Sequence, residues 1–195
     1  MRESLDVDRL TAALVRSGSP WTTVEVHRRL GSTNAEALRD PRPGRVVLTE
    51  HQVSGRGRLA RGWQTPDRAA VTGSFCVAAA DDAPLGWLPL LTGVAVCEAI
   101  EAQTGILAAL KWPNDVLLPQ DGERKVCGIL CELSPTDAVV VVGVGMNVDQ
   151  TRAELPVDTG ISLALAGALD TGTAAVREGL ATALGNTTAG LGGAP

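Results

Sequence analysis

A nearly continuous run of valines between Ala138 and Val148 is the feature that most limits how this chain can fold. The run lacks the alternation of apolar and polar residues that a half-exposed strand shows, so it predicts a strand buried on both faces. Such a strand lies within a sheet that other elements cover on both sides. Gly143 and Gly145 interrupt the run, and glycines inside a strand often mark a close approach of a ligand or of another backbone.

The remaining sequence supplies the strands and helices that such a sheet requires. We expect strands at residues 21–26, 45–50, 69–80, 116–118, 125–132 and 138–148, and helices at 6–15, 35–38, 89–103, 159–168 and 173–184. Residues 51–68 are polar and rich in glycine, and they form a loop too long to be a simple turn. The order of these elements predicts an α+β fold in which a mixed sheet packs against helices, and 195 residues is the length of one domain.

The formal net charge of −5 is unfavourable for a protein that binds a nucleic-acid backbone, although Arg56, Arg58 and Arg61 lie close together. The chain has no long uninterrupted apolar run, and its first residues do not resemble a secretory signal, so we expect no membrane span and no export. The four cysteines form no Cys-x-x-Cys pair and only two histidines could assist them, so we expect no structural zinc site. Reduced, buried cysteines in a cytoplasmic protein fit this usage.

Five short segments combine glycines with charged, hydroxyl or amide side chains. They read GSTN at 31–34, EHQVSGRGRLARGW at 50–63, KWPND at 111–115, KVCGILCE at 125–132 and GVGMN at 143–147. In the second segment, Gly55 and Gly57 allow the backbone to approach a ligand closely, and the neighbouring arginines suit phosphate or carboxylate oxygens. A solvated basic loop, or one that binds RNA, is an equal interpretation of this segment alone.

Taken singly, the other four segments have structural explanations as well. Ser32 or Thr33 can cap a helix, and Asn114 can form an Asx turn. Lys125 can extend from a strand edge into solvent, and the last segment lacks the third glycine and the following helix of a dinucleotide site. No Ser–His–acid arrangement is visible, so nothing in the sequence predicts covalent catalysis by the protein.

Together and in this order, the five segments resemble those of biotin protein ligases, the biotin–acetyl-CoA-carboxylase ligases with the biotinyl/lipoyl attachment fold. The resemblance covers residues 25–150, and five segments in one order are far more specific than any one of them. It implies an α+β catalytic fold like that of class II aminoacyl-tRNA synthetases. It also implies two steps: biotin and ATP with Mg²⁺ give biotinyl-5′-AMP and pyrophosphate, and a lysine of a biotin carboxyl carrier protein then receives the biotin.

The resemblance implies a role for each matching residue. The catalytic residues would be Lys125, Arg56, Arg58 and Lys111. Biotin would be bound by Ser32, Thr33, Asn34, Gln52, Gly55, Arg56, Gly57, Arg58, Lys125, Gly128, Gly143 and Gly145. ATP would be bound by Arg56, Arg58, Arg61, Trp63, Lys111, Asn114, Asp115 and Asn147. No dedicated metal site is expected, because Mg²⁺ would arrive with ATP and Asp115 is the one candidate ligand.

Within these sets, Lys125 would lie at the biotin carboxylate and the α-phosphate, where charge develops. The glycines of the last two segments would leave room for the biotin bicycle, and Trp63 would pack near the adenine. Lys111 and Lys125 are the only lysines among 17 basic residues, and both fall inside the five segments. Coding bias explains why lysine is scarce but not why both lysines lie there, where a compact cation suits the proposed chemistry.

The resemblance also predicts what the chain lacks. We expect a catalytic domain at residues 1–189 and a glycine-rich tail at 190–195 that does not fold, with neither an N-terminal DNA-binding domain nor the small C-terminal β domain common in the family. No DNA or membrane partner is expected, and a homodimer is compatible with the sequence. Two alternatives stay open: a lipoate or octanoate ligase or transferase of the same fold, and a biotin-binding protein without efficient transfer.

Overall fold

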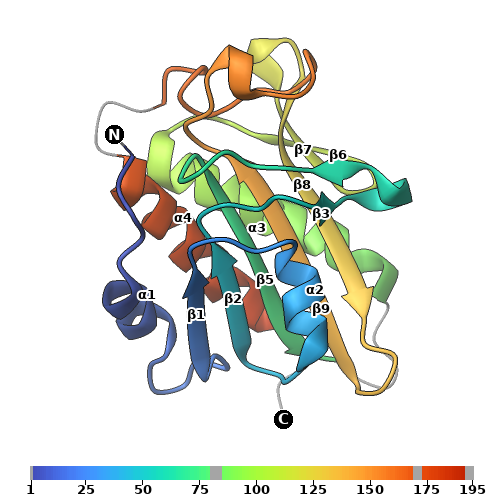
Figure 1. Ribbon diagram of the computed structural model, residues 1–195. Coiled ribbons are helices and arrows are strands. Elements are labelled where there is room, and N and C mark those ends of the chain that lie inside the picture. The colour runs from blue at the N-terminus through green and yellow to red at the C-terminus, as the bar shows by residue number, and fades with distance from the viewer. Residues whose placement is uncertain (1, 80–84, 169–172, 192–195) are drawn as a thin grey trace.

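The computed structural model describes residues 2–79, 85–168 and 173–191, which build a seven-stranded mixed sheet with helices on both faces (Figure 1). In sheet order the strands are β1 (Thr23–His27), β2 (Arg45–Thr49), β5 (Ala70–Ala78), β9 (Val139–Asn147), β8 (Arg124–Leu133), β7 (Asp115–Leu118) and β6 (Ala109–Lys111). Strands β1 and β2 are parallel, and every other neighbouring pair in this sheet is antiparallel. This arrangement confirms the predicted α+β fold.

The helices divide unequally between the two faces of the sheet. They are α1 (Val7–Leu14), α2 (Thr33–Arg39), α3 (Leu88–Thr104) and α4 (Thr173–Thr188), with short 3₁₀ turns η1 (Arg58–Ala60), η2 (Leu85–Trp87), η3 (Pro119–Asp121), η4 (Arg152–Glu154) and η5 (Ala189–Leu191). Figure 1 shows α3 and α4 behind the sheet and α2 in front of it, and α1 packs against α4 and β1. A separate pair of two-residue strands, β3 (Gly55–Arg56) and β4 (Gly62–Trp63), lies in front as well.

Strand β9 is the buried central strand that the valine run predicts. On the face toward α3 and α4, Val140, Val142, Val144 and Met146 belong to the main hydrophobic core. On the opposite face, Val139 and Val141 pack with Ala37 of α2 in a smaller core, and the alternation then reaches Gly143 and Gly145. The same strand therefore fills the core on one face and, on part of the other, has glycines in place of side chains.

Local sequence signals set the ends of two helices as expected. The Ser32 hydroxyl accepts a hydrogen bond from the Ala35 amide at 3.4 Å and caps α2. Gly105 ends α3 in the left-handed region, with φ of 71°. One stretch among the described residues, Leu85–Thr104, is long and apolar enough to cross a membrane by length and composition alone, and one face of α3 packs against the sheet and α4.

One prediction at the C-terminal end is wrong, the helix at residues 159–168. Residues 159–168 do not form a helix, because Gly160 bridges to Lys125 beside β8, which draws the chain into an extended path before a turn. The tail predicted to be unfolded at 190–195 begins inside η5, and residues 192–195 lie outside the described residues. Residue 80 of the predicted strand 69–80 lies outside them too.

Candidate functional site

The candidate site lies on the front face of the sheet, where three strands carry glycines or small polar residues instead of large side chains. Gly128 of β8 and Gly145 of β9 are paired in register, and Thr72 of β5 is paired with Gly145 on its other side. The Trp63 indole covers the glycines: a Cβ on Gly128 would lie 3.1 Å from it, and a Cβ on Gly145 would overlap Nε1. A side chain at either position would push the indole away from the sheet, so its present packing depends on both glycines.

Lys125 borders the indole and is held by an acidic partner. Its Nζ lies 2.6 Å from Asp115 Oδ1 and 5.2 Å from the centroid of the Trp63 ring. Both members of this ion pair are half-buried. The pair forms because β7 and β8 are hydrogen-bonded neighbours, with a register shift at Val116/Leu117. The ammonium group is thereby fixed above the glycine-lined backbone, although Asp115 was predicted as a residue of the ATP site.

The backbone of Lys125 is held from the other side by residues 159–161. The Lys125 amide donates to the Thr159 carbonyl at 2.8 Å, and the Ile161 amide donates to the Lys125 carbonyl at 2.9 Å. Asn147, at the end of β9, donates its Nδ2 to the Ile161 carbonyl at 3.0 Å and accepts from Gln150 at 2.9 Å. Asn147 therefore braces this connection with both polar groups of its side chain.

Asn34 is the buried polar hub of the same face. Its Nδ2 donates to the Leu130 carbonyl at 3.0 Å and to Glu132 Oε2 at 2.8 Å, and its Oδ1 accepts from the Ser74 hydroxyl at 2.6 Å. The missing side chain of Gly143 leaves the space that this amide occupies. Asn34 thus anchors α2 to the sheet, so the space over Gly143 is already filled.

Gln52 joins the start of α2 to the loop that carries Trp63. Its Oε1 accepts from the Thr33 amide at 2.9 Å, and its Nε2 donates to the Trp63 carbonyl at 3.3 Å. Gly55 fits tightly against this side chain, because a Cβ there would overlap Gln52 Nε2. Among the predicted biotin residues, Gln52 therefore contacts both Thr33 and Gly55 beside Trp63.

The arginine loop, residues 55–63, is exposed over most of its length between Gly55, which is buried, and Trp63, which is half-buried. Arg56, Arg58 and Arg61 are all exposed, and the single ion pair that these arginines make among the described residues joins Arg56 to Glu132 at 3.6 Å. Arg58 also lines a cavity of about 470 Å³ together with Asn114. Two predicted ATP residues thus meet at one cavity.

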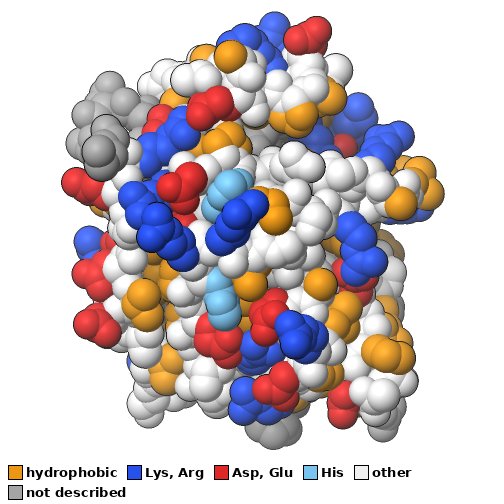
Figure 2. Space-filling view, viewed as in Figure 1, with side chains coloured by type: hydrophobic (Ala, Val, Ile, Leu, Met, Phe, Trp, Pro, Cys, Tyr) orange, Lys and Arg blue, Asp and Glu red, His pale blue; other side chains and the backbone are white. Residues whose placement is uncertain are grey.

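Lys111 and Asn114 take different positions in the hairpin that leads to Lys125. Asn114 Nδ2 donates to the Ile129 carbonyl at 2.8 Å, which fixes the turn before β7 against β8. Lys111 is paired in register with Asp115 on the edge strand β6, and its side chain is exposed. Figure 2 shows this side of the molecule with basic and acidic side chains interspersed around a largely uncharged central area.

Two buried polar atoms at the site lack hydrogen-bond partners among the described residues: Trp63 Nε1 and Thr72 Oγ1. An unpaired buried donor or acceptor is costly, so such atoms are rare unless a ligand completes them. Sequence reasoning missed Thr72, and it gave no role to Glu132, which contacts both Asn34 and Arg56. The available signals were the hydroxyl of Thr72 within β5 and the carboxylate of Glu132 near the end of β8.

The cysteines beside the site are unsuited to nucleophilic chemistry. Burial raises the pKa of the Cys131 thiol to about 12 and the pKa of Cys127 further still, so both stay protonated at neutral pH. Among the residues that the structure describes, no group of three His, Cys, Asp or Glu side chains could hold a metal ion. The polar groups gathered at the site are cations, carboxylates, amides, hydroxyls and backbone groups.

Fold and site together define a domain in which glycines of two neighbouring strands lie under one tryptophan, beside a lysine held by an ion pair. The chain belongs to the biotin/lipoate A/B protein ligase family, whose sequence profile matches residues 26–149. It is 38% identical to the biotin–[acetyl-CoA-carboxylase] ligase of Mycobacterium tuberculosis over 81% of this chain and 61% of that protein. It is 37% identical to the bifunctional ligase/repressor BirA of Bacillus spizizenii over 58% of this chain and 35% of that protein. The chain thus spans less than two thirds of these curated relatives.

Solved structures agree with this assignment. The biotin protein ligase from Aquifex aeolicus in complex with biotin and ATP superposes with a TM-score of 0.71 and 29% identity, covering 86% of this chain and 70% of that one. The Leishmania major ligase in complex with biotinyl-5-AMP shares the fold, with a TM-score of 0.64 and 18% identity over 84% of this chain and 74% of that one. The family resemblance and the fold expected from the five segments are confirmed.

Proposed function

We propose that this chain is the catalytic domain of a biotin–protein ligase. It joins biotin to ATP as biotinyl-5′-AMP and then transfers the biotinyl group to a lysine of a biotin carboxyl carrier protein. The observation that carries the proposal is the group formed by Lys125, Trp63 and the paired glycines 128 and 145, with two unpaired polar atoms facing it. The M. tuberculosis relative named as a biotin ligase supports the choice of substrate.

The first step brings two anions together, so it needs fixed positive charge more than a general base. A biotin carboxylate oxygen bonds to the α-phosphorus of ATP, and the bond to the β-phosphate oxygen breaks to release pyrophosphate. We assign Lys125 to the oxygens on which charge develops, because Asp115 and the backbone of residues 159–161 already hold it in place. A preorganised cation of this kind stabilises the transition state without reorganising during the reaction.

In this proposal, biotin binds beside Trp63 and Thr72. The ureido ring offers both donors and acceptors, which would satisfy Trp63 Nε1 and Thr72 Oγ1. Because the indole now covers Gly145, biotin binding there requires the indole to move off the sheet. We accordingly assign Trp63 to the biotin side of the site rather than to the adenine. Ser32, Thr33 and Gln52 remain the proposed partners at the edge of the pocket.

The nucleotide end is assigned to the arginine loop and the adjoining cavity. Arg56, Arg58 and Arg61 are exposed and can turn toward phosphate oxygens, and the cavity shared by Arg58 and Asn114 lies next to them. Lys111 reaches the triphosphate from the edge strand. Mg²⁺ neutralises phosphate charge when it arrives bound to ATP, and we assign it no residue because Asp115 is engaged by Lys125.

In the second step, the carrier's lysine amine attacks the acyl carbon of biotinyl-5′-AMP and AMP leaves with the electrons of the acyl–phosphate bond. The exposed arginine loop leaves this face accessible to a carrier domain. We place the reaction in the cytoplasm, where ATP and carrier proteins meet. We also propose that the protein forms a homodimer and has no DNA partner.

The deciding experiment measures substrate choice and transfer together. Purified protein is incubated with Mg²⁺-ATP and either biotin, lipoate or octanoate, and acyl-adenylate is detected by mass spectrometry; an apo carrier domain is then added. We expect biotinyl-5′-AMP and a carrier heavier by one biotinyl group. Lipoyl- or octanoyl-adenylate alone would contradict the biotin assignment. Biotinyl-5′-AMP without carrier labelling would identify a biotin-activating domain that cannot transfer.

A further inference from the structure

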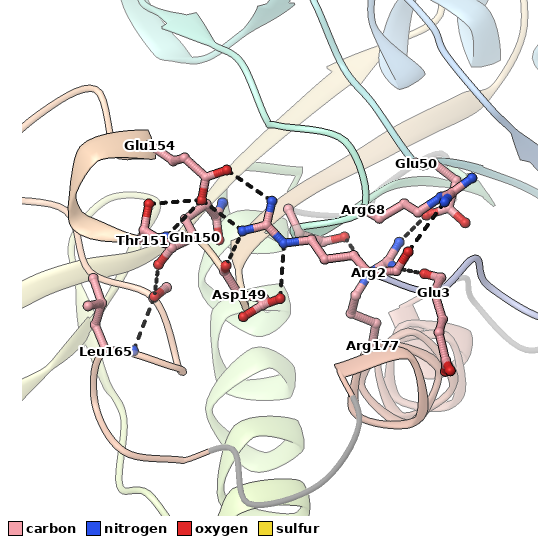
Figure 3. Close-up of polar contacts among 12 residues, drawn as sticks. Arg2, Glu3, Glu50, Arg68, Asp149, Gln150, Thr151, Glu154, Leu165 and Arg177 are labelled. Carbon is pink, nitrogen blue, oxygen red and sulfur yellow. Dashed lines mark hydrogen bonds and ion pairs between the residues drawn. The ribbon is translucent and has the colours of Figure 1, made fainter.

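The first residues of the chain form a strap that reaches the segment behind Lys125. Residues 2–6, the N-terminal arm, run across the ends of β2 and α4 (Figure 3). At the far end of the arm, Arg2 donates from Nη1 and Nη2 to both oxygens of Glu154, at 3.0 and 2.7 Å, and from Nε to Asp149 at 3.0 Å. One guanidinium thus binds two carboxylates, including a bidentate pair, which is the strongest geometry for this type of contact.

The arm itself is anchored along its length. Arg177 is fully buried, is paired with Glu50, and donates to the Glu3 carbonyl at 3.0 Å. Glu50 accepts in turn from the Leu5 amide at 2.6 Å. Arg68 donates to the Arg2 carbonyl at 3.3 Å. The arm is therefore a fixed support from which Arg2 extends, and Figure 3 shows Arg2 lying between the Arg177–Glu50 group and the Asp149–Glu154 group.

Residues 149–162, the braced segment, carry the contact from Glu154 to Lys125. Glu154 accepts from the Thr151 amide at 2.9 Å and hydroxyl at 3.0 Å, which closes η4 into a capping box. Arg152, in the same turn, donates to the Gly160 carbonyl at 2.8 Å and the Val157 carbonyl at 2.7 Å. Thr159 and Ile161 then bond the backbone of Lys125. Arg2 is therefore connected to Lys125 through hydrogen bonds and the short backbone segments between the bonded residues.

From this continuous set of contacts, we propose that Arg2 is a positioning residue that holds the braced segment in the conformation that supports Lys125. Arg2 does not touch the reacting atoms and acts through Glu154 and η4. The proposal rests on the proposed function for its consequence in catalysis, but the holding of the segment is a property of the unliganded protein. Without Arg2, the braced segment would occupy the supporting conformation only part of the time. The apparent affinity for substrate would then fall by the same fraction.

The test compares Arg2→Ala, Arg2→Lys and Glu154→Gln with wild type. Hydrogen–deuterium exchange of peptides from residues 149–162 should be about tenfold faster in Arg2→Ala and in Glu154→Gln. In the biotin-dependent ATP–pyrophosphate exchange assay, the KM for ATP should rise about tenfold in Arg2→Ala while kcat changes less than about twofold, because only the competent fraction of the protein falls. Arg2→Lys, which can pair with one carboxylate at a time, should lie between Arg2→Ala and wild type.

Arg9→Ala is the matched control, because it removes another arginine near the N-terminus whose ion pair, to Glu178 at 3.3 Å, does not reach the braced segment. It should leave the exchange of residues 149–162 and the KM for ATP unchanged. Unchanged exchange in Arg2→Ala, or an equal increase in Arg9→Ala, would overturn the proposal. If wild type shows no biotin-dependent pyrophosphate exchange, the proposed function fails, and the deuterium measurement still decides whether Arg2 holds the segment.

Discussion

The two segments that flank Lys125 are attached to the domain in contrasting ways. The arginine loop rests on a pair of two-residue strands, leaves its three arginines exposed, and holds Leu59 and Ala60 at positive φ values of 58° and 57°. The braced segment is tied by Arg2, Arg152 and Asn147 and by the Ser162 hydroxyl, which donates to the Gln150 carbonyl at 2.6 Å. One side of the lysine is held in place and the other is open to rearrangement.

Because of this difference, we expect the braced segment to contribute to the stability of the fold and the arginine loop to contribute to ligand binding. Substitutions on the braced side should lower the free energy of unfolding, because they leave buried groups without partners. Substitutions in the arginine loop should leave that free energy nearly unchanged and alter substrate binding instead.

Arg177→Met should give the largest loss, about 3–5 kcal/mol, because it strands Glu50 as an unpaired buried carboxylate and removes a bond to the Ala70 carbonyl. Urea denaturation followed by circular dichroism measures the loss. Arg16→Met is the control, since its exposed guanidinium makes one hydrogen bond, to Asn186, and the expected change is about 0.5 kcal/mol or less. Similar losses in the two variants would contradict the importance of the buried pair.

Gly145→Ala should cost about 1–3 kcal/mol, because its Cβ would overlap the Trp63 indole and force it off the sheet. The tryptophan emission should also shift as the indole becomes exposed. Gly62→Ala in the arginine loop is matched to it, because a Cβ there meets nothing within 4 Å and the residue is not at positive φ. Equal thermal stability of Gly145→Ala and Gly62→Ala would mean that the indole does not rest on Gly145.

Acid should weaken the ion pair between Arg2 and Glu154, and with it the folded state, over a defined pH range. Hydrogen bonding to Arg2 lowers the pKa of Glu154 to about 2 from an ordinary value of 4.5. The carboxylate therefore stabilises the folded state above about pH 4.5, and this contribution, about 1 kcal/mol or less, is lost as the pH falls toward 2. The free energy of unfolding should fall more steeply over that range in wild type than in Glu154→Gln. Parallel pH profiles would exclude a stabilising role for this ion pair.

Arg58→Ala should have the smallest effect on stability, within about 0.5 kcal/mol, because the side chain is exposed and makes no ion pair among the described residues. Its KM for ATP should nevertheless rise by roughly tenfold or more if the guanidinium binds phosphate oxygens. Denaturation and pyrophosphate exchange on the same preparation provide both values. A stability loss comparable to that of Gly145→Ala would remove the contrast between the two sides.

Much of this architecture follows from local patterns in the sequence. The valine run predicts β9 and its two buried faces, and Ser32 and Gly105 mark the ends of helices because capping depends on neighbouring residues. The order of the five segments predicts the family. These features depend on residues close in sequence or on the alternation of side chains along strands.

The contacts that hold the site could not be predicted in this way. The Lys125–Asp115 pair depends on the register of β7 and β8, and Arg2 meets Glu154 across 152 positions of sequence. The error at residues 159–168 has the same cause, since the helical pattern there yields to pairing of Gly160 beside Lys125. The packing of the Trp63 ring on Gly128 and Gly145 likewise joins residues that lie far apart in the sequence.

We assign Lys125 to stabilising the formation of biotinyl-5′-AMP, and the Lys125→Met substitution tests this role because it keeps the length of the side chain and removes its charge. Biotin-dependent ATP–pyrophosphate exchange by this variant should fall by at least about a thousandfold, while its circular dichroism spectrum and thermal midpoint stay close to those of wild type. Exchange at the wild-type rate by a folded Lys125→Met protein would contradict the account.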